Sequence, residues 1–240
     1  MEVFPETLVV PYTPLLVVSG GLRILIDTGA GPLAPTTGRL GTSLANAGFQ
    51  PDEIDLVVLS HAHPDHIGGL LADDGAVMFP NARFVMSRRE YDLWHSTEMR
   101  NGLGTGAIFG NPHIEELMSA WVARYLTPMV HRMEWVDSEL EIAPGITVFP
   151  AAGHTPAHCG VAISSGSETL LYAADAFGMP EHIAHPEWTS SFDLDRPQTV
   201  ATRKRLLDRA ATEHCRVYDY HFSRVGAVMR HGTGFAWEPE

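Results

Sequence analysis

The sequence predicts a mixed α and β fold, and three observations carry this prediction. Short apolar runs that contain β-branched residues recur along the chain, as expected of buried strands, and they alternate with segments of helical periodicity. A chain of 240 residues can bury one large core, and no linker-like tract divides it. We therefore expect a single domain over residues 1–240. Polar residues follow several of the apolar runs, so candidate functional side chains are expected at strand ends.

The N-terminal half contains the clearest strand and helix signals. The expected strands are residues 15–18, 22–27, 56–59 and 82–86, and the first two form a hairpin around Ser19-Gly20-Gly21. The expected helices are residues 41–47, closed by Gly48, and residues 88–94. Ser87 is the expected N-cap of the second helix, because Glu90 follows it three residues later, as in a capping box.

Residues 95–129 differ in character from their neighbours and are interpreted as an insertion. Residues 101–106 are loose and rich in glycine, whereas residues 113–126 have helical periodicity. Large apolar side chains in and near the insertion either pack in the core or face a pocket. These residues are Trp94, Met99, Phe109 and Trp121.

The C-terminal half repeats the order of strands followed by a helix. The expected strands are residues 132–136, 146–149, 161–163, 169–172 and 216–220. The expected long helix is residues 197–212, with Asp195 as its cap and Pro197 in its first turn. Residues 176–191 form an irregular stretch before this helix.

The sequence His61-Ala-His-Pro-Asp-His66 is the clearest candidate functional site. It follows an expected buried strand, and side chains two apart on extended backbone point the same way, so His61 and His63 can bind one metal ion. Pro64 stiffens a turn that carries Asp65 and His66 to the other side of the cluster, where they can bind a second ion. A polar loop that is merely rich in histidine is the alternative, but buried apolar strands rarely end this way.

This cluster resembles the HxHxDH motif of the metallo-β-lactamase superfamily, and later segments resemble other family positions in the same order. His154 lies in GHTPAH, which resembles the family segment GHTPGH with Ala157 in place of glycine. Asp175 follows a strand, as the metal-bridging Asp of the family does, and His221 follows a late strand. The resemblance runs from about Leu15 to His221. It implies an αββα sandwich, in which two mixed β-sheets pack face to face, helices lie outside and a dinuclear metal site lies at one edge.

The resemblance also implies which side chains bind metal and which support them. The ligands are His61, His63 and His154 for one ion and Asp65, His66 and His221 for the other, with Asp175 between them. Asp27 matches a family Asp that sits behind the ligands and orients a metal-bound His, although a simple turn carboxylate is the alternative. His158 is expected to brace the ligand loop around His154.

This ligand set indicates hydrolytic chemistry. Neutral imidazoles and carboxylates suit zinc, although manganese, cobalt and iron can occupy such sites. Metal binding lowers the pKa of water from 15.7 to about 7, so a metal-bridging hydroxide is the expected nucleophile. In related lactonases the Asp that matches Asp65 passes a proton to the leaving oxygen, which makes Asp65 the candidate catalytic residue. We expect a dinuclear zinc-dependent hydrolase that opens lactones, such as N-acyl homoserine lactones, or cleaves related esters.

Ligand identity separates the branches of the superfamily only in part. His63 differs from the Glu of the diiron flavoproteins, and Asp175 differs from the Cys or Ser of true β-lactamases. Residues 79–83, residues 182–188 and the ending Tyr220-His221-Phe222 look most like quorum-quenching lactonases and methyl parathion hydrolase. The alternatives are an organophosphate or aryl ester hydrolase of the latter type, a β-lactamase-like or glyoxalase II-like hydrolase, and a non-catalytic metal-binding scaffold.

The pocket walls are expected in two places. In lactonase-like members of the superfamily, an insertion such as residues 95–129 helps to wall the pocket. The expected substrate contacts follow Asp175 in the irregular stretch and are Phe177, Met179, His182 and Trp188. Some lactonases have a substrate-contacting Tyr three residues after the bridging Asp, but Gly178 stands there in this chain.

Composition limits the partners. Lys and Arg number 16 against 29 Asp and Glu, and a net charge of −13 argues against nucleic-acid binding. No apolar run approaches the ~20 residues that span a bilayer, and MEVFPETLVV lacks the basic start of a signal peptide, so we expect no membrane partner and a cytoplasmic location. The two cysteines, Cys159 and Cys215, are expected as reduced thiols. A small-molecule ester or lactone is the expected partner, with a homodimer open because dimers are common in such families.

Overall fold

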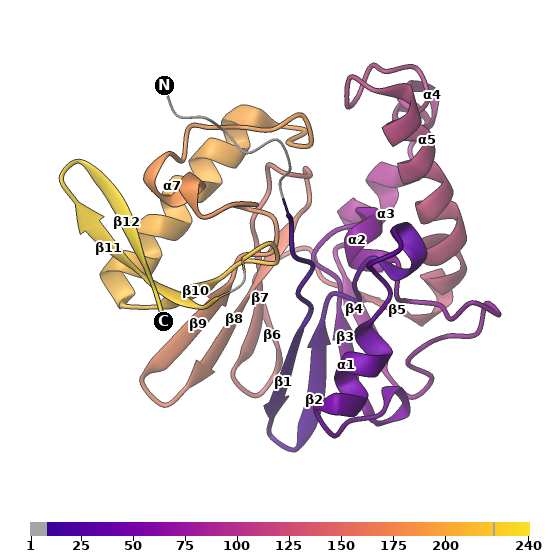
Figure 1. Ribbon diagram of the computed structural model, residues 1–240, viewed down its shortest axis with the longest axis horizontal. Coiled ribbons are helices and arrows are strands. Elements are labelled where there is room, and N and C mark those ends of the chain that lie inside the picture. The colour runs from indigo at the N-terminus through magenta and orange to yellow at the C-terminus, as the bar shows by residue number, and fades with distance from the viewer. Residues whose placement is uncertain (1–8, 223) are drawn as a thin grey trace.

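The structure, a computed structural model, describes residues 9–222 and 224–240 as two β-sheets packed face to face, with helices on both outer faces (Figure 1). The first sheet contains, in spatial order, β1 (Leu15–Ser19), β2 (Leu22–Ile26), β3 (Leu56–Val58), β4 (Arg83–Met86) and β5 (Met133–Trp135). The second sheet contains, in spatial order, β12 (Gly234–Pro239), β11 (Gly226–His231), β10 (Arg216–Tyr218), β9 (Glu168–Tyr172), β8 (Cys159–Ser165), β7 (Ile146–Pro150) and β6 (Leu140–Ala143).

Parallel pairing brings the ends of distant strands to one edge of the sandwich. Strands β2, β3, β4 and β5 pair in parallel, and so do β9 and β10, whereas the remaining pairs are antiparallel. Parallel neighbours need crossover connections and release the chain at the same edge. The registers Ile26↔Val58 and Tyr172↔Tyr218 therefore align the segments that follow β2, β3, β9 and β10.

The helices divide between the two outer faces. The helices of the first half are α1 (Leu40–Asn46), α2 (Pro64–Ile67), α3 (Arg88–Trp94), α4 (Thr97–Gly102) and α5 (Pro112–Trp121), with short turns η1 (Gly31–Leu33), η2 (Pro51–Glu53), η3 (Val122–Leu126) and η4 (Thr127–Arg132). The helices of the second half are α6 (Glu181–Ala184) and α7 (Arg196–Glu213). In Figure 1, α7 covers the second sheet, while α1 to α5 lie on the side of the first sheet.

Alternation of side chains along the strands builds three layers of core. Ile24 and Ile26 of β2 face the second sheet, where they meet Tyr172, whereas Leu25 faces the helices of the first half. On the far side, Leu206 and Leu207 of α7 pack on the second sheet. Each sheet is thus apolar on both faces, which confirms the predicted αββα sandwich.

Several local predictions are corrected by the structure. The helix expected over residues 113–126 is α-helical only to Trp121, and residues 122–126 form a π-helical turn. Ser87 does accept from the backbone N–H of Glu90, but the Glu90 carboxylate turns into the protein instead of completing a capping box. Three strands were not predicted: β6, β11 and β12.

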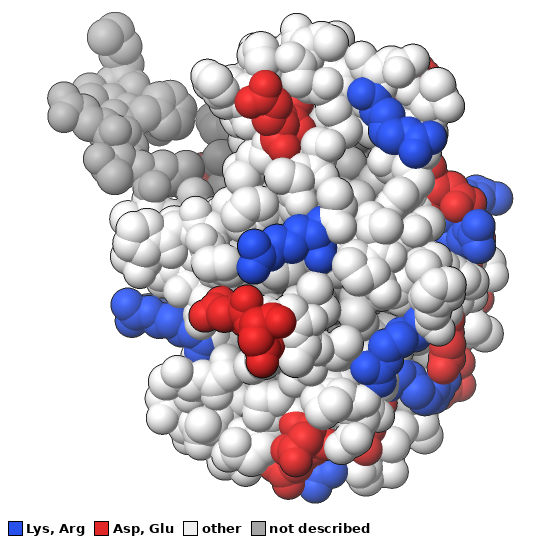
Figure 2. Space-filling model, turned by 90° about the vertical axis from the view of Figure 1, so that its right-hand side faces the viewer, with Lys and Arg blue, Asp and Glu red and all other residues white. Residues whose placement is uncertain are grey.

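Basic and acidic side chains are interspersed on one face of the molecule. Figure 2 shows this face, which is the right-hand side of Figure 1. Among residues 9–222 and 224–240, no helix has both the length and the apolar character that a membrane crossing needs.

Candidate metal centre

Strand ends and one short helix deliver the candidate ligands. His61 and His63 follow β3, with His63 on extended backbone, and Pro64 opens α2, which carries Asp65 and His66. The turn after α2 packs directly on the segment after β2. A Cβ atom on Gly69 would lie 2.0 Å from the carbonyl oxygen of Thr28, so only glycine allows this approach.

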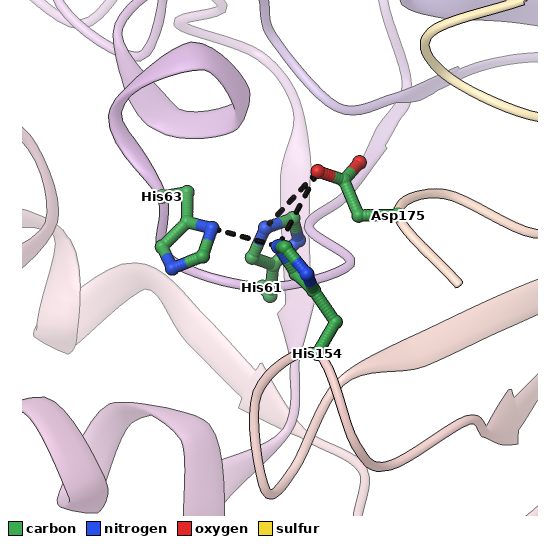
Figure 3. A group of neighbouring side chains, drawn as sticks. All are labelled: His61, His63, His154 and Asp175. Atoms are coloured by element: carbon green, nitrogen blue, oxygen red, sulfur yellow. Dashed lines mark hydrogen bonds and ion pairs between the residues drawn. The ribbon is translucent and has the colours of Figure 1, made fainter. Parts of the chain in front are cut away.

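The first group of ligands consists of His61, His63, His154 and Asp175 (Figure 3). All four side chains are buried. His154 Nε2 lies 2.9 Å from His63 Nδ1 and 3.4 Å from Asp175 Oδ2, and His61 Nε2 lies 3.9 Å from the same oxygen. The four ligand atoms all lie within 4.8 Å of one another, which is close enough for one ion to contact each of them.

The second group consists of Asp65, His66, His221 and again Asp175, with its ligand atoms also within 4.8 Å of one another. His66 Nε2 is 3.0 Å from Asp175 Oδ1, and His221 Nε2 is 3.0 Å from Asp175 Oδ2. Asp65 Oδ2 is 3.6 Å from both imidazole nitrogens. Asp175 therefore belongs to both groups, and all seven sequence-predicted ligands come together.

Buried polar atoms indicate that these groups suit cations. His61 Nε2 is buried without a hydrogen-bond partner among the described residues, and the buried atoms His66 Nε2 and Asp175 Oδ1, which lie 3.0 Å apart, have no partner there other than each other. A buried polar atom without a partner is costly, and a bound cation would satisfy all three. Burial, followed by repulsion from neighbouring imidazoles, lowers the pKa of His61 well below its usual value, so this ring is neutral, as a metal ligand must be.

Charge is distributed differently in the second group. Burial lowers the pKa of His66, but Asp175, Asp27 and Asp65 outweigh it and hold that pKa well above its usual value. Burial raises the pKa of Asp175, but His221 and His66 outweigh it and keep that carboxyl ionised. The carboxylates of this group thus attract positive charge, which protons supply here and which a divalent ion would supply in their place.

A cavity of about 440 Å³ opens over both groups, a size typical of small-molecule sites. Its lining includes the side chains of Asp65, His154, Asp175 and other ligands. The walls are mainly apolar and come from the chain start, η1, α5 and the segments after β9. The apolar wall residues are Val10, Leu33, Ile114, Leu117, Met118, Phe177, Met179 and Phe192.

Comparison with known proteins identifies the family. The sequence profile of the Metallo-beta-lactamase superfamily matches residues 9–217. The chain belongs to this superfamily. The predicted resemblance is therefore confirmed, and the ligand groups occupy the edge of the sandwich at which the superfamily was expected to bind metal.

Individual relatives point toward lactonases. An N-acyl homoserine lactonase, AiiA of Bacillus thuringiensis subsp. kurstaki, is 26% identical over 171 residues, which make up 71% of this chain and 56% of the relative. The chain thus spans little more than half the length of the curated relatives it matches. Among solved structures, one similar protein is the dizinc quorum-quenching lactonase AidC in complex with a product. Its TM-score is 0.83 and its sequence identity is 32%, and the match covers 95% of this chain and 79% of the AidC chain. The hydrolase AbOPH shares the fold, with a TM-score of 0.81, 24% identity and coverage of 94% and 78%.

Asp27 lies behind the second group, as its match to the superfamily implied. Its Oδ2 lies 2.9 Å from His66 Nδ1 and accepts from the hydroxyls of Ser60 and Tyr172, each at 2.8 Å. Its Oδ1 accepts from the Ser60 backbone N–H. Asp27 has a left-handed φ of 60° although it is not glycine, and these four contacts stabilise that backbone. The arrangement fixes the His66 ring with Nε2 directed at the cluster.

His158 supports Asp175 through its backbone. His158 Nδ1 donates to the carbonyl of Ala151, and His158 Nε2 accepts from the N–H of Asp175 at 3.1 Å. Burial and the neighbouring His154 lower the pKa of His158 to about 4, so the ring stays neutral and can accept. His158 is thus a structural brace of the loop that carries Asp175.

Asp193 and Arg203 support His154 and were not predicted. Asp193 Oδ1 lies 3.0 Å from His154 Nδ1, and its Oδ2 lies 3.5 Å from the Arg203 guanidinium. Arg203 also donates to the backbone carbonyls of Ala176, Phe177 and Trp188. One buried cation therefore holds both the partner of a ligand and the segment that follows Asp175. In the sequence, Asp193 is a lone acidic residue and Arg203 is one basic residue on a long helix, so neither can be told from an ordinary surface residue.

Glu90 joins two ligand segments and was also missed. Its buried carboxylate accepts from the backbone N–H of Ala62 at 3.2 Å, from Trp94 Nε1 at 2.8 Å and from the Thr155 hydroxyl at 2.7 Å. Ala62 lies between His61 and His63, and Thr155 follows His154. Burial raises the pKa of Glu90, while these three donors counteract the rise. Glu90 therefore ties together the two segments that supply the imidazoles of the first group.

Three of the four predicted substrate contacts line the cavity. These are Phe177, Met179 and His182. His182 Nδ1 donates to the carbonyl of Phe177, and burial together with Arg203 lowers its pKa to about 4, so the ring is neutral near pH 7. Trp188 does not line the cavity, contrary to expectation: its ring stacks on His185 at 4.3 Å and is 36% exposed. The short helix α6 turns the chain so that Phe192, instead of Trp188, reaches the cavity wall.

The insertion supplies part of the wall and part of the core. Trp94, Met99 and Phe109 are buried in the core of the first half, and Trp121 packs against that core. Phe109 and Trp94 also touch a ligand, with ring centroids 5.9 and 5.7 Å from that of His63. The core interpretation of these four residues therefore holds, and the insertion contributes to the cavity wall through Ile114, Leu117 and Met118 of α5 instead.

Proposed function

We propose that this protein is a dinuclear metal-dependent hydrolase that opens lactones or cleaves related esters. The observation that carries the proposal is the position of Asp175, which is shared by two ligand groups and lines a mainly apolar cavity. The ligand types favour Zn²⁺ in both groups. Bound there, two such ions would lower the pKa of a water molecule and polarise the substrate carbonyl.

The protein's own side chains have distinct tasks in this proposal. The three histidines of the first group and the two of the second present nitrogen ligands. Asp65 is the one carboxylate among the ligands that serves a single group, and its side chain is 16% exposed at the cavity. We assign Asp65 a second task, to carry a proton on its carboxyl oxygen to the leaving alkoxide. His182 is unsuited to this task because its low pKa leaves it without a proton near pH 7.

The cavity wall supports an acyl-bearing substrate. Leu117 and Met118 of α5, together with Phe177 and Phe192, line a space that an alkyl chain can fill. Several curated relatives, AiiA among them, are N-acyl homoserine lactonases by name, and AidC was solved with N-hexanoyl-L-homoserine. N-acyl homoserine lactones are therefore the substrates we propose to test first.

A substrate panel tests the proposal. Protein loaded with zinc is offered an N-acyl homoserine lactone, a simple lactone, an aryl ester, an organophosphate and a β-lactam. We expect the highest kcat/KM on a lactone with an alkyl side chain. A clear preference for the organophosphate would instead indicate a phosphotriester hydrolase. No turnover of any compound by protein with full metal content would favour a metal-binding scaffold.

A further inference from the structure

Most polar side chains along the cavity are already engaged. Of the non-ligand ones, Asp193 and Arg203 bind each other and their neighbours, and His182 donates to a carbonyl. Two hydroxyl groups remain, those of Ser190 and Tyr12, whose hydrogens have no acceptor among residues 9–222 and 224–240. Of the two, Tyr12 contacts a ligand residue, because its ring meets the ring of His221 edge-on at 5.7 Å.

Tyr12 is fixed in place by its two chain neighbours. His221 Nδ1 donates to the carbonyl of Pro11 at 3.0 Å, and the N–H of Thr13 donates to the carbonyl of Tyr220 at 3.2 Å. The Thr13 hydroxyl donates to that same carbonyl. Between these anchors, the Tyr12 ring stacks on Tyr220 with centroids 6.1 Å apart and planes 21° apart. The segment therefore holds the Tyr12 ring beside the second ligand group, with 37% of the residue exposed to solvent.

The Tyr12 hydroxyl can act as a hydrogen-bond donor. A phenol has an ordinary pKa of about 10, so it carries its proton at neutral pH and can donate it to an acceptor in a hydrogen bond. Tyr12 also lies on the same cavity as the ligand atoms, where a substrate carbonyl would bind.

We propose that the Tyr12 hydroxyl donates a hydrogen bond to the carbonyl oxygen of the scissile ester or lactone and stabilises the negative charge that develops there. The inference rests on the proposed function, since it concerns the same substrate. The hydroxyl keeps its proton throughout, so no covalent step is added. A donor placed where charge develops favours the transition state over the bound substrate, so its removal lowers kcat more than it raises KM.

The test is Tyr12→Phe, which keeps the stacked ring and removes only the hydroxyl. Tyr91→Phe is the matched control, because Tyr91 stacks on His95 and does not line the cavity. Kinetics are measured on the best lactone and on a nitrophenyl ester, with metal content and melting temperature measured for each protein. We expect Tyr12→Phe to lower kcat roughly 10- to 100-fold on both substrates, with unchanged metal content and melting temperature. Tyr91→Phe should match the wild type.

The outcomes separate this inference from the proposed function. If the wild type hydrolyses neither substrate, the proposed function fails and Tyr12 has no such task. If the wild type is active and Tyr12→Phe retains kcat within twofold, the inference alone is overturned. A loss confined to KM, or a loss accompanied by released metal, also overturns it, because Tyr12 would then serve binding or structure. Titration with the hydroxy acid product gives an independent readout, and we expect weaker binding to Tyr12→Phe than to Tyr91→Phe.

Discussion

The two ligand groups share Asp175 but are held in different ways. The first group is buried, and its histidines are supported by Glu90 and Asp193 from within the protein. The second group is partly exposed at Asp65 and His221, and His221 is supported by Pro11 near the start of the chain. The first group is therefore the more fully buried cation site. In the second group Asp27 fixes His66, while Asp65 and His221 stay partly exposed at the cavity, which suits a site that handles substrate.

The largest effect is expected from the shared residue. Asp175→Ala should release at least one ion and lower turnover by on the order of 10³-fold or more, because both groups lose an anionic ligand. Elemental analysis of protein purified without chelator should give nearly two ions per chain for the wild type and no more than one for the variant. Asp92→Ala, which removes an exposed carboxylate paired with Arg88, serves as the control. One ion in fully loaded, folded wild type would rule out a bridging Asp175.

The second largest effect is expected at Asp65, and it tests whether this residue donates a proton in addition to binding metal in the second group. Asp65→Asn, in protein shown to retain both ions, should lose roughly 10²–10⁴-fold in rate on an alkyl lactone. The loss on a nitrophenyl ester should be far smaller, because nitrophenolate leaves without a proton. The ratio of the two losses is the measurement. Equal losses would mean that Asp65 acts only as a ligand.

Replacing Glu90 should have a smaller effect, and its effect on metal affinity should be confined to the first group. Glu90→Ala leaves the Ala62 N–H and Trp94 Nε1 without their acceptor, and each buried donor without a partner costs about 1–3 kcal/mol. We expect a lower melting temperature and a roughly 10- to 100-fold weaker affinity for the more tightly held ion, measured by chelator competition. Glu90→Gln keeps an acceptor oxygen, so it should retain most of the melting temperature and most of the affinity for this ion. The assignment fails if Glu90→Ala and the wild type bind this ion equally well.

The smallest effect should appear in the second group alone. Thr13→Val removes the hydroxyl that donates to the carbonyl of Tyr220 and preserves the shape of the side chain. One hydrogen bond contributes about 1 kcal/mol, so the more weakly held ion should bind about fivefold more weakly. Chelator competition that resolves the two ions gives the measurement. A change at the tightly held ion instead would show that the two groups are not supported independently.

Sequence reasoning succeeded where the information is local. The cluster from His61 to His66 is predictable because the period of a strand and the turn at Pro64 fix the directions of its side chains. The sandwich and the distant ligands His154 and His221 required the resemblance, since periodicity indicates only mixed α and β. The seven predicted ligands meet in space, and the predicted supporting residues Asp27 and His158 both contact ligands.

The residues that were missed act over long separations or resemble common local patterns. Glu90 fits a capping box so well that its inward direction cannot be inferred from sequence, because a buried carboxylate and a capping one have the same spacing. Tyr12 lies in a segment with no strand or helix signal and gains its position only from residues 220–222. Trp188 was placed in the wall by its proximity to Asp175 in sequence, but the chain turns at α6. Side-chain direction in irregular segments depends on tertiary contacts that sequence spacing does not encode.

The contact between Pro11 and His221 has a consequence for the order in which the protein folds. It joins residues 210 positions apart, whereas the His63–His154 contact of the first group joins residues 91 apart. Closing a longer loop costs more entropy, and contacts between distant residues slow folding. During synthesis, the first group has all of its imidazoles once residue 154 has emerged, but the second must wait for residue 221. Under the proposed function, the buried group would therefore capture its metal ion first, and the second group would be completed only when the beginning of the chain meets its late strands.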